Sequence, residues 1–263
     1  MKRILFLMLM VVFIATPVWA ATFVNGGFET GDKTGWTEGG GSWGAVNYGY
    51  IYGGTSPVGV YYTGGALPVA SDYVGGISNN TIVGPGVDPI TGQSTVYNGS
   101  YAVRANDYVN DFSVSTIKQS VTNYTDNDIY FAWNAVLLAS HGLPDSDYFG
   151  LTLRDDTTNT DMVSRSYSSA SAPGIFTDFG GWYGSGWQVE HIDLAALGIV
   201  GHDFTLSLLA SDCPYGGHAG YVYLDGFGAA PPVQGVPEPA TVLLFGAGLA
   251  GLGFLRNRFK KSV

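Results

Sequence analysis

The sequence predicts an all-β domain, an antiparallel two-sheet β-sandwich. The first observation is composition: glycine occurs 39 times in 263 residues, 14% of the chain is aromatic and only 12% is charged. Good helix formers are scarce while Thr, Val, Tyr and Ser abound, which favours strands joined by many turns. The second is a series of short alternating stretches separated by Gly, Asn and Asp, and the third is that no long amphipathic helix or internal repeat interrupts them. Short strands in this rhythm are typical of a sandwich.

The first 20 residues predict a signal peptide. Lys2-Arg3 precede an apolar run, Ile4–Ala15, and Val18-Trp19-Ala20 supplies the small or branched residues that signal peptidase reads. Residues 1–20 are therefore expected to form a signal helix that is cleaved after Ala20.

Residues 21–228 form the predicted β-sandwich domain, which opens on Phe23–Gly31 and Thr34-Gly35-Trp36. This stretch resembles the first strand of jelly-roll carbohydrate-binding domains, in which the pattern N-x-G-F-E-x-G-x-x-x-G-W is common. The resemblance implies a jelly-roll-like fold, with Phe23 and Phe28 as apolar anchors and Trp36 over one end of the sandwich.

Residues 39–92 mix Gly, Tyr, Ser, Pro and Val with few charges, and no period persists. Two readings stay open for them. One is a pair of short strands, Val46–Tyr52 and Val58–Tyr62; the other is a mobile, aromatic-rich flap.

Regular strand patterns follow to the end of the domain. Apolar alternation and turn residues predict strands and one hairpin. The expected strands are Ser100–Ala105, Ser115–Val121, Ile129–Leu138 (buried on both faces), the hairpin Tyr148–Arg154 and Met162–Tyr167, Trp182–Val189, Phe204–Leu208 and the closing strand Tyr221–Asp225. A short helical turn is expected at Ala195–Leu197, ending at Gly198. Residues 229–235, rich in Ala and Pro and ending at Gly235, are the expected linker.

The C-terminal segment, 236–263, has three parts: Pro237-Glu238-Pro239, an uncharged apolar run at 240–255, and a basic tail that includes Arg256 and Arg258. A helix of 16 residues would be about 24 Å long, short of the ~30 Å hydrocarbon core. The positive-inside rule keeps the basic tail cytoplasmic. A transient transmembrane helix is expected, with a permanent anchor as the alternative.

This arrangement resembles the PEP-CTERM sorting signal of Gram-negative bacteria. The resemblance implies processing by an exosortase, with Pro237, Glu238, Pro239, Arg256 and Arg258 as the sorting residues. It also implies export, transient anchoring in the inner membrane, and a final place at the cell surface or in an exopolysaccharide (biofilm) matrix. How the processed protein is anchored stays open.

Charge excludes one class of partner. Of 11 basic and 21 acidic residues, six basic residues and one acid lie in the two terminal segments, which leaves 5 basic and 20 acidic residues in 21–235. A net charge of about −15 repels nucleic acid and favours divalent cations.

A calcium ion is the expected cofactor. In the jelly-roll domains that the chain resembles, a structural Ca²⁺ joins the first and last strands, which implies Glu29 and Asp225 as ligands, helped by carbonyl groups near Gly31. Ca²⁺ takes six to eight oxygens, and the single Cys213 excludes an internal disulfide as a substitute. The alternative is that both acids are ordinary turn residues.

Four aromatic residues are candidates for sugar binding: Trp43, Trp182, Tyr183 and Trp187. They lie among glycines, where flat rings could be exposed. The alternative is burial, since large rings dominate cores, and Trp36 and Trp133 are expected there.

Catalysis is not expected. Cys213 and His218 share a loop, but neither a base nor an oxyanion hole can be inferred beside the thiol, and zinc needs more ligands. Carboxylates that could form a hydrolytic pair are Asp145, Asp147, Asp155, Asp156 and Glu190. No G-x-S-x-G or H-E-x-x-H motif occurs. The sequence thus favours a non-catalytic polysaccharide-binding or structural protein; a polysaccharide hydrolase or lyase and a self-associating adhesin stay open.

Overall fold

The computed structural model describes residues 22–43, 51–52, 78–141, 146–169, 174–228 and 230–231. The predicted signal peptide, the sorting segment with its apolar run at 240–255, and the predicted strand Val58–Tyr62 lie outside these residues.

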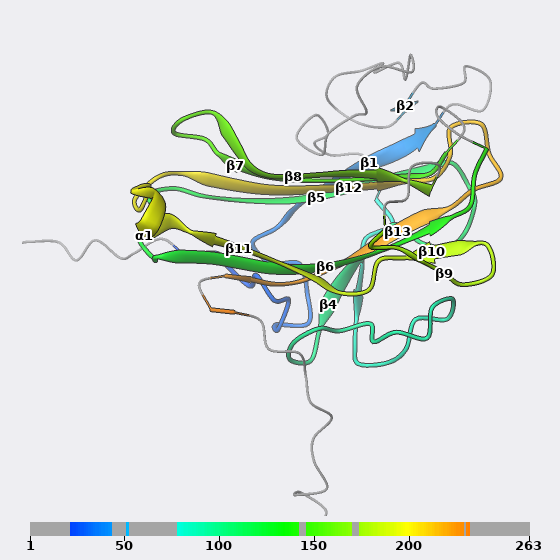
Figure 1. The fold of residues 1–263 in the computed structure, drawn as a ribbon, viewed down its shortest axis with the longest axis horizontal. Coiled ribbons are helices and arrows are strands. Elements are labelled where there is room, and N and C mark those ends of the chain that lie inside the picture. The colour runs from blue at the N-terminus through cyan, green and yellow to red at the C-terminus, as the bar shows by residue number, and fades with distance from the viewer. Residues whose placement is uncertain are drawn as a thin grey trace, which may run out of the picture.

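Two antiparallel sheets lie face to face (Figure 1), as the sequence predicts. The first sheet has the order β2-β1-β5-β12-β7-β8. Its strands are β1 (Thr37–Trp43), β2 (Ile51–Tyr52), β5 (Ser113–Val121), β7 (Tyr148–Asp155), β8 (Thr160–Ser168) and β12 (Phe204–Ser211).

The second sheet has the order β3-β4-β13-β6-β10-β9, and β11 also pairs with β6. Its strands are β3 (Thr81–Val83), β4 (Ala102–Ala105), β6 (Asp128–Leu138), β9 (Thr177–Asp178), β10 (Trp182–Gly184), β11 (Gln188–Asp193) and β13 (Gly220–Gly228). The closing strand β13 thus lies inside its sheet, between β4 and β6 (Figure 1).

Alternation along the strands separates core from surface. In β12, Phe204, Leu206 and Leu208 are fully buried between the sheets, while Thr205 lies on the outer face and is partly exposed. The central strand β6 is buried along most of its length, which confirms the burial predicted for Ile129–Leu138. Period-two patterns therefore located the core correctly.

A single helical turn, α1 (Leu194–Leu197), follows β11. The Asp193 carboxylate accepts a 2.8 Å hydrogen bond from the amide of Ala196, and Gly198 ends the turn in the left-handed conformation, with φ of 71°. Both are standard capping devices. The predicted helix and its end are confirmed.

The N-terminal stretch differs from the prediction. Residues 24–27 form turns instead of a strand, because Asn25 and Phe28 have φ of 52° and 60°, outside the strand region. The predicted packing does hold: Phe28 is fully buried and stacks on Trp36, with ring centroids 4.9 Å apart, and Phe23 packs on Phe227. The first strand is β1, whose central residues Gly39–Gly41 gave no strand signal.

Residues 84–100 pack on the outer face of the second sheet. Asp88 is 1% exposed and accepts hydrogen bonds from the hydroxyls of Tyr221 and Tyr223 on β13, at 2.7 and 2.8 Å. A small apolar cluster fills the interface, formed by Val83, Ile90, Val136, Trp182, Trp187, Tyr221 and Tyr223. The described end of the 39–92 region is therefore a packed covering segment and not a flap.

Candidate functional site

A polar groove of about 460 Å³ lies on the outer face of the first sheet. Every side chain that lines it is charged or carries a hydroxyl: Lys118, Ser120, Thr152, Arg154, Asp156, Asp161, Thr205 and Ser207. Its volume falls in the range of small-ligand sites, 300–1,000 Å³.

Strand register builds the groove in two rungs. In one, Lys118 of β5 lies opposite Ser207 of β12, which lies opposite Thr152 of β7. In the other, Ser120, Thr205 and Arg154 are aligned in the same way. Because every second residue of a strand faces the same side, both rungs project from one surface of the sheet.

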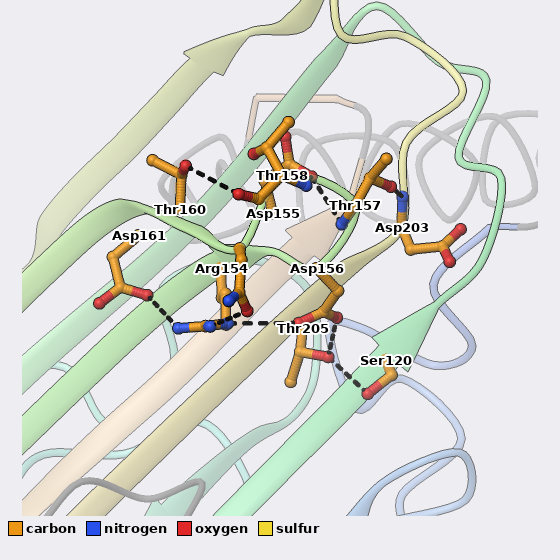
Figure 2. Close-up of polar contacts among 11 residues, drawn as sticks. Ser120, Arg154, Asp155, Asp156, Thr157, Thr158, Thr160, Asp161, Asp203 and Thr205 are labelled. Atoms are coloured by element: carbon orange, nitrogen blue, oxygen red, sulfur yellow. Dashed lines mark hydrogen bonds and ion pairs between the residues drawn. The ribbon is translucent and has the colours of Figure 1, made fainter.

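The second rung continues into a chain of hydrogen bonds and ion pairs, seen in Figure 2. The hydroxyls of Ser120 and Thr205 are 2.7 Å apart, and Thr205 donates to Asp156 Oδ2 at 2.6 Å. Asp156 Oδ1 is 3.7 Å from Arg154 Nε, and Arg154 Nη1 donates to Asp161 at 3.3 Å.

The chain is further fixed at the β7–β8 turn. Arg154 donates to the side-chain oxygen of Asn159, and the adjacent Asp155 accepts amide hydrogen bonds from Thr157 and Thr158 at 3.0 and 3.1 Å. Asp155 also contacts His202 Nδ1 at 2.8 Å. Donors and acceptors of the second rung are therefore held in place before any ligand arrives.

None of the groove residues except Asp156 was among the residues predicted for a site. Their strands were predicted, and Lys118, Thr152 and Thr205 occupy the outward positions of those strands. The missing information was register, which decides which outward residues become neighbours.

The predicted aromatic platform is divided between the two sheets. Trp43 ends β1, is only 4% exposed and donates from its indole to the carbonyl of Asp212 at 2.8 Å. The exposed setting expected for Trp43 is therefore wrong, because its ring is enclosed by Val114, Tyr148 and Leu209.

Trp182, Tyr183 and Trp187 belong to the second sheet and its flank, and all three are partly exposed. Trp187 donates to the carbonyl of Ser94 at 2.9 Å, and its ring centroid is 5.4 Å from that of Tyr97. Trp182 lies 6.1 Å from Tyr221. The ligand role of these three residues stays a prediction.

Glu29 and Asp225 meet at the same short segment of chain. Asp225 is fully buried, and its Oδ2 accepts hydrogen bonds from the amides of Tyr97 and Asn98 at 2.9 and 2.8 Å. The Glu29 carboxylate accepts from the amides of Ser100 and Tyr101, at 3.0 to 3.2 Å. Four backbone amides within residues 97–101 thus donate to two carboxylates that come from opposite ends of the domain.

One atom of this arrangement suits a cation. Asp225 Oδ1 is buried and has no hydrogen-bond partner among the residues that the structure describes. The pKa of Asp225 is raised to about 7, chiefly by burial and to a smaller extent by the nearby Glu29 charge, against the lowering effect of its amide hydrogen bonds. Within the described ranges no three His, Cys, Asp or Glu side chains group as metal ligands, so an ion here would need backbone oxygens as well. The hard oxygen donors fit Ca²⁺.

The remaining acids proposed for hydrolysis are dispersed. Glu190 forms a bidentate pair with Arg165 (2.7 and 2.8 Å), and Asp155 and Asp156 belong to the network at the groove. Asp147 is fully buried, and burial raises its pKa to about 8. Asp145 lies outside the described residues.

Comparison with known proteins gives one sequence motif. Residues 235–258 match the PEP-CTERM protein-sorting motif. Among curated proteins, none matches the chain. In the part of the chain that the structure describes, no helix has the length and apolar character needed to cross a membrane.

Solved structures similar to this chain include several carbohydrate-binding modules. TmCBM61, solved with β-1,4-galactotriose, is 11% identical with a TM-score of 0.38, over 79% of this chain and 96% of that one. The family 11 module from Clostridium thermocellum, solved with a mixed-linked tetrasaccharide, is 8% identical with a TM-score of 0.28, over 82% and 99%. The active domain of a bacteriophage CBA120 tailspike is 9% identical with a TM-score of 0.33, over 78% and 21%. These similarities are too low to transfer a ligand or a residue role.

Proposed function

We propose that this chain is an exported, non-catalytic polysaccharide-binding protein, and that the polar groove on the outer face of β5, β12 and β7 is its binding surface. The observation that carries the proposal is the connected series Ser120–Thr205–Asp156–Arg154–Asp161. Sugar hydroxyls both donate and accept, so they match a surface on which hydroxyls, carboxylates and a guanidinium alternate.

Rigidity supports the same reading. The groove residues project mainly from a continuous antiparallel sheet, and those of the second rung are already hydrogen-bonded to one another. A ligand that exchanges its water contacts for such fixed partners loses little affinity to ordering of side chains. The shape of the groove follows from strand register and not from a long loop.

The sorting motif supports the destination. A chain with residues 235–258 of this type is proposed to reach the cell exterior through an exosortase, after removal of the N-terminal segment by signal peptidase. The Pro237-Glu238-Pro239 triplet would be read during processing, with Arg256 and Arg258 on the cytoplasmic side. The groove would then face extracellular polysaccharide.

A structural Ca²⁺ at Glu29 and Asp225 is part of the proposal. The unpartnered Asp225 Oδ1 and the raised pKa of that carboxyl mean that an ionised Asp225 is poorly compensated by the protein alone. A cation at this point would compensate the charge and fasten the N-terminal turns to β13. Its role would be to stabilise the fold.

The test is binding of the full-length chain, purified in mild detergent, to a panel of neutral and acidic polysaccharides by isothermal titration calorimetry. We expect binding without cleavage of the polymer. Thr205→Val, which breaks the chain of hydrogen bonds at its centre, should weaken binding about tenfold. Ser164→Ala, on exposed β8 outside the groove lining, is the matched control and should bind normally. Absence of binding to every polymer, or equal binding by the Thr205→Val protein, would refute the proposal.

A further inference from the structure

All but one of the Lys and Arg side chains in the described domain have a hydrogen-bond or ion-pair partner. Residues 21–235 contain five Lys and Arg residues against 20 Asp and Glu. Four of the five have polar partners: Lys33 with Glu38, Arg104 with the Asn106 carbonyl, Arg154 with Asp161, and Arg165 with Glu190. The ammonium group of Lys118 has no hydrogen-bond or ion-pair partner among the residues that the structure describes.

The position of Lys118 makes this exception informative. It is partly buried at the centre of β5, opposite Ser207 on one side and Thr37 on the other, and it lines the polar groove. Arg104 also lacks an acidic partner, but its guanidinium donates to a backbone carbonyl, so Lys118 differs from the other four in that its side chain lacks any polar partner within the described residues. Partial burial also lessens its hydration, which an anionic partner would offset.

The two rungs of the groove therefore differ in charge. In the second rung the guanidinium of Arg154 is already matched by Asp156 and Asp161. In the first rung the residues aligned with Lys118 carry hydroxyls and no charge: Thr37 on one side, and Ser207 followed by Thr152 on the other. An anion bound at Lys118 would have one compact positive charge and two hydroxyl donors around it.

We propose that Lys118 selects an acidic polysaccharide by pairing with the carboxylate of a uronic acid residue, a local attraction that acts against the repulsion from the net negative charge of the domain. This inference rests on the proposed function and names the ligand class for the same groove. A lysine ammonium is a point charge that accepts a carboxylate in several orientations, and each such charge-assisted hydrogen bond is stronger than one between neutral groups. The hydroxyls of the uronate would be held by the neighbouring Ser and Thr side chains.

The experiment compares each of three uronate polymers, polygalacturonate, alginate and hyaluronate, with its carboxyl-reduced form, using the full-length chain. For at least one polymer we expect the native form to bind about five- to tenfold more tightly than the reduced form at a fixed NaCl concentration. Lys118→Met should bind both forms equally, at the affinity of the reduced form, whereas Lys118→Arg should keep most of the preference.

Two controls isolate the local effect. Val87→Asp lowers the net charge by one, as Lys118→Met does, at a side chain that is 70% exposed on the segment covering the other sheet, and it should keep the preference. The melting temperature of Lys118→Met should equal that of the wild type, because no bond in the protein is lost. Equal binding of native and reduced polymers, a preference retained in Lys118→Met, or binding to none of these polymers overturns this inference alone. Absence of binding to every polymer of the wider neutral and acidic panel overturns the proposed function as well.

Discussion

Asp88 and Tyr221, 133 residues apart in the chain, are joined by a 2.7 Å hydrogen bond from the tyrosine hydroxyl to the buried carboxylate. The other carboxylate oxygen accepts hydrogen bonds from the amides of Ile90 and Thr91, at 3.1 and 2.7 Å. One side chain therefore both shapes the turn at 88–92 and fastens it to β13.

Replacing Asp88 by Ala should lower the free energy of unfolding by about 3 kcal/mol, because two buried tyrosine hydroxyls and the turn amides lose their acceptor. Tyr223→Phe is the matched control and should cost about 1 kcal/mol, since Asp88 keeps its other donors. Urea unfolding followed by tryptophan fluorescence measures both. Equal losses in the two variants would contradict the role given to Asp88.

The contact of Glu29 with the turn at 98–101 predicts that Ala substitutions at two glycines, Gly92 and Gly99, differ in their cost to stability. Gly99 and Gly92 have φ of 73° and 68°, but a Cβ at Gly99 would lie 2.4 Å from Glu29 Oε1, while a Cβ at Gly92 meets nothing within 4 Å. Gly92→Ala should therefore cost only the left-handed strain of about 1–2 kcal/mol. Gly99→Ala should cost clearly more, by urea unfolding. Equal costs would mean that Glu29 does not confine this turn.

Removal of calcium should lower the melting temperature of the full-length chain. A ligand present at 100 times its dissociation constant contributes about 2.7 kcal/mol, and each 1 kcal/mol corresponds to about 2–4 °C in a domain of this size. Differential scanning fluorimetry with CaCl₂ or EDTA measures the shift. Asp225→Asn should not respond, whereas Asp178→Asn should respond like the wild type; identical melting with and without EDTA in the wild type would exclude a structural calcium ion.

Asp147 predicts a pH dependence of stability. Its pKa is near 3.8 when unfolded and is raised to about 8 by burial in the folded protein. Between these values the folded state binds more protons at this site than the unfolded state, so the stability contributed falls as pH rises from about 4 to about 8, by at most about 1.4 kcal/mol per pH unit.

Asp147→Asn replaces the titratable carboxyl group by an amide that does not titrate. The fall in the free energy of unfolding measured from pH 5 to pH 8.5 should therefore become less steep. The readout is the slope, which is independent of any fixed cost of the substitution. An unchanged slope would assign the pH dependence to other groups, such as Asp212, whose pKa burial raises to about 7.

The sequence predicted what depends on local pattern. Alternation located β12 and the β7–β8 hairpin, and Gly198 located the end of α1. Prediction from the sequence pattern failed where the backbone conformation is irregular, as at Phe28. It also failed where glycines leave no apolar alternation, as in β1. The groove could not be predicted, because Lys118, Thr152 and Ser207 become neighbours only through the register in which their strands pair. A single sequence does not determine this register.

The sequence also did not show which side chains are buried by contact with another strand or segment. Trp43 lies among glycines, as exposed rings often do, yet it is buried because β1 pairs with β5 and brings the ring against Val114 and Leu209. Similarly, nothing local in 84–100 indicated that this segment would pack on Tyr221. Tertiary contacts decide which aromatic residues meet solvent.

The inner position of β13 has a mechanical consequence. The chain leaves the domain from a strand that is hydrogen-bonded on both sides, to β4 and to β6, and whose last residues are packed against the N-terminal turns through Phe23 and Phe227. A pull on the chain beyond Gly228 therefore loads the middle of a sheet and not a peripheral ribbon that could peel away one bond at a time. A domain held by its C-terminal end in flowing water would pass the drag force through β13 into β6 and then β4.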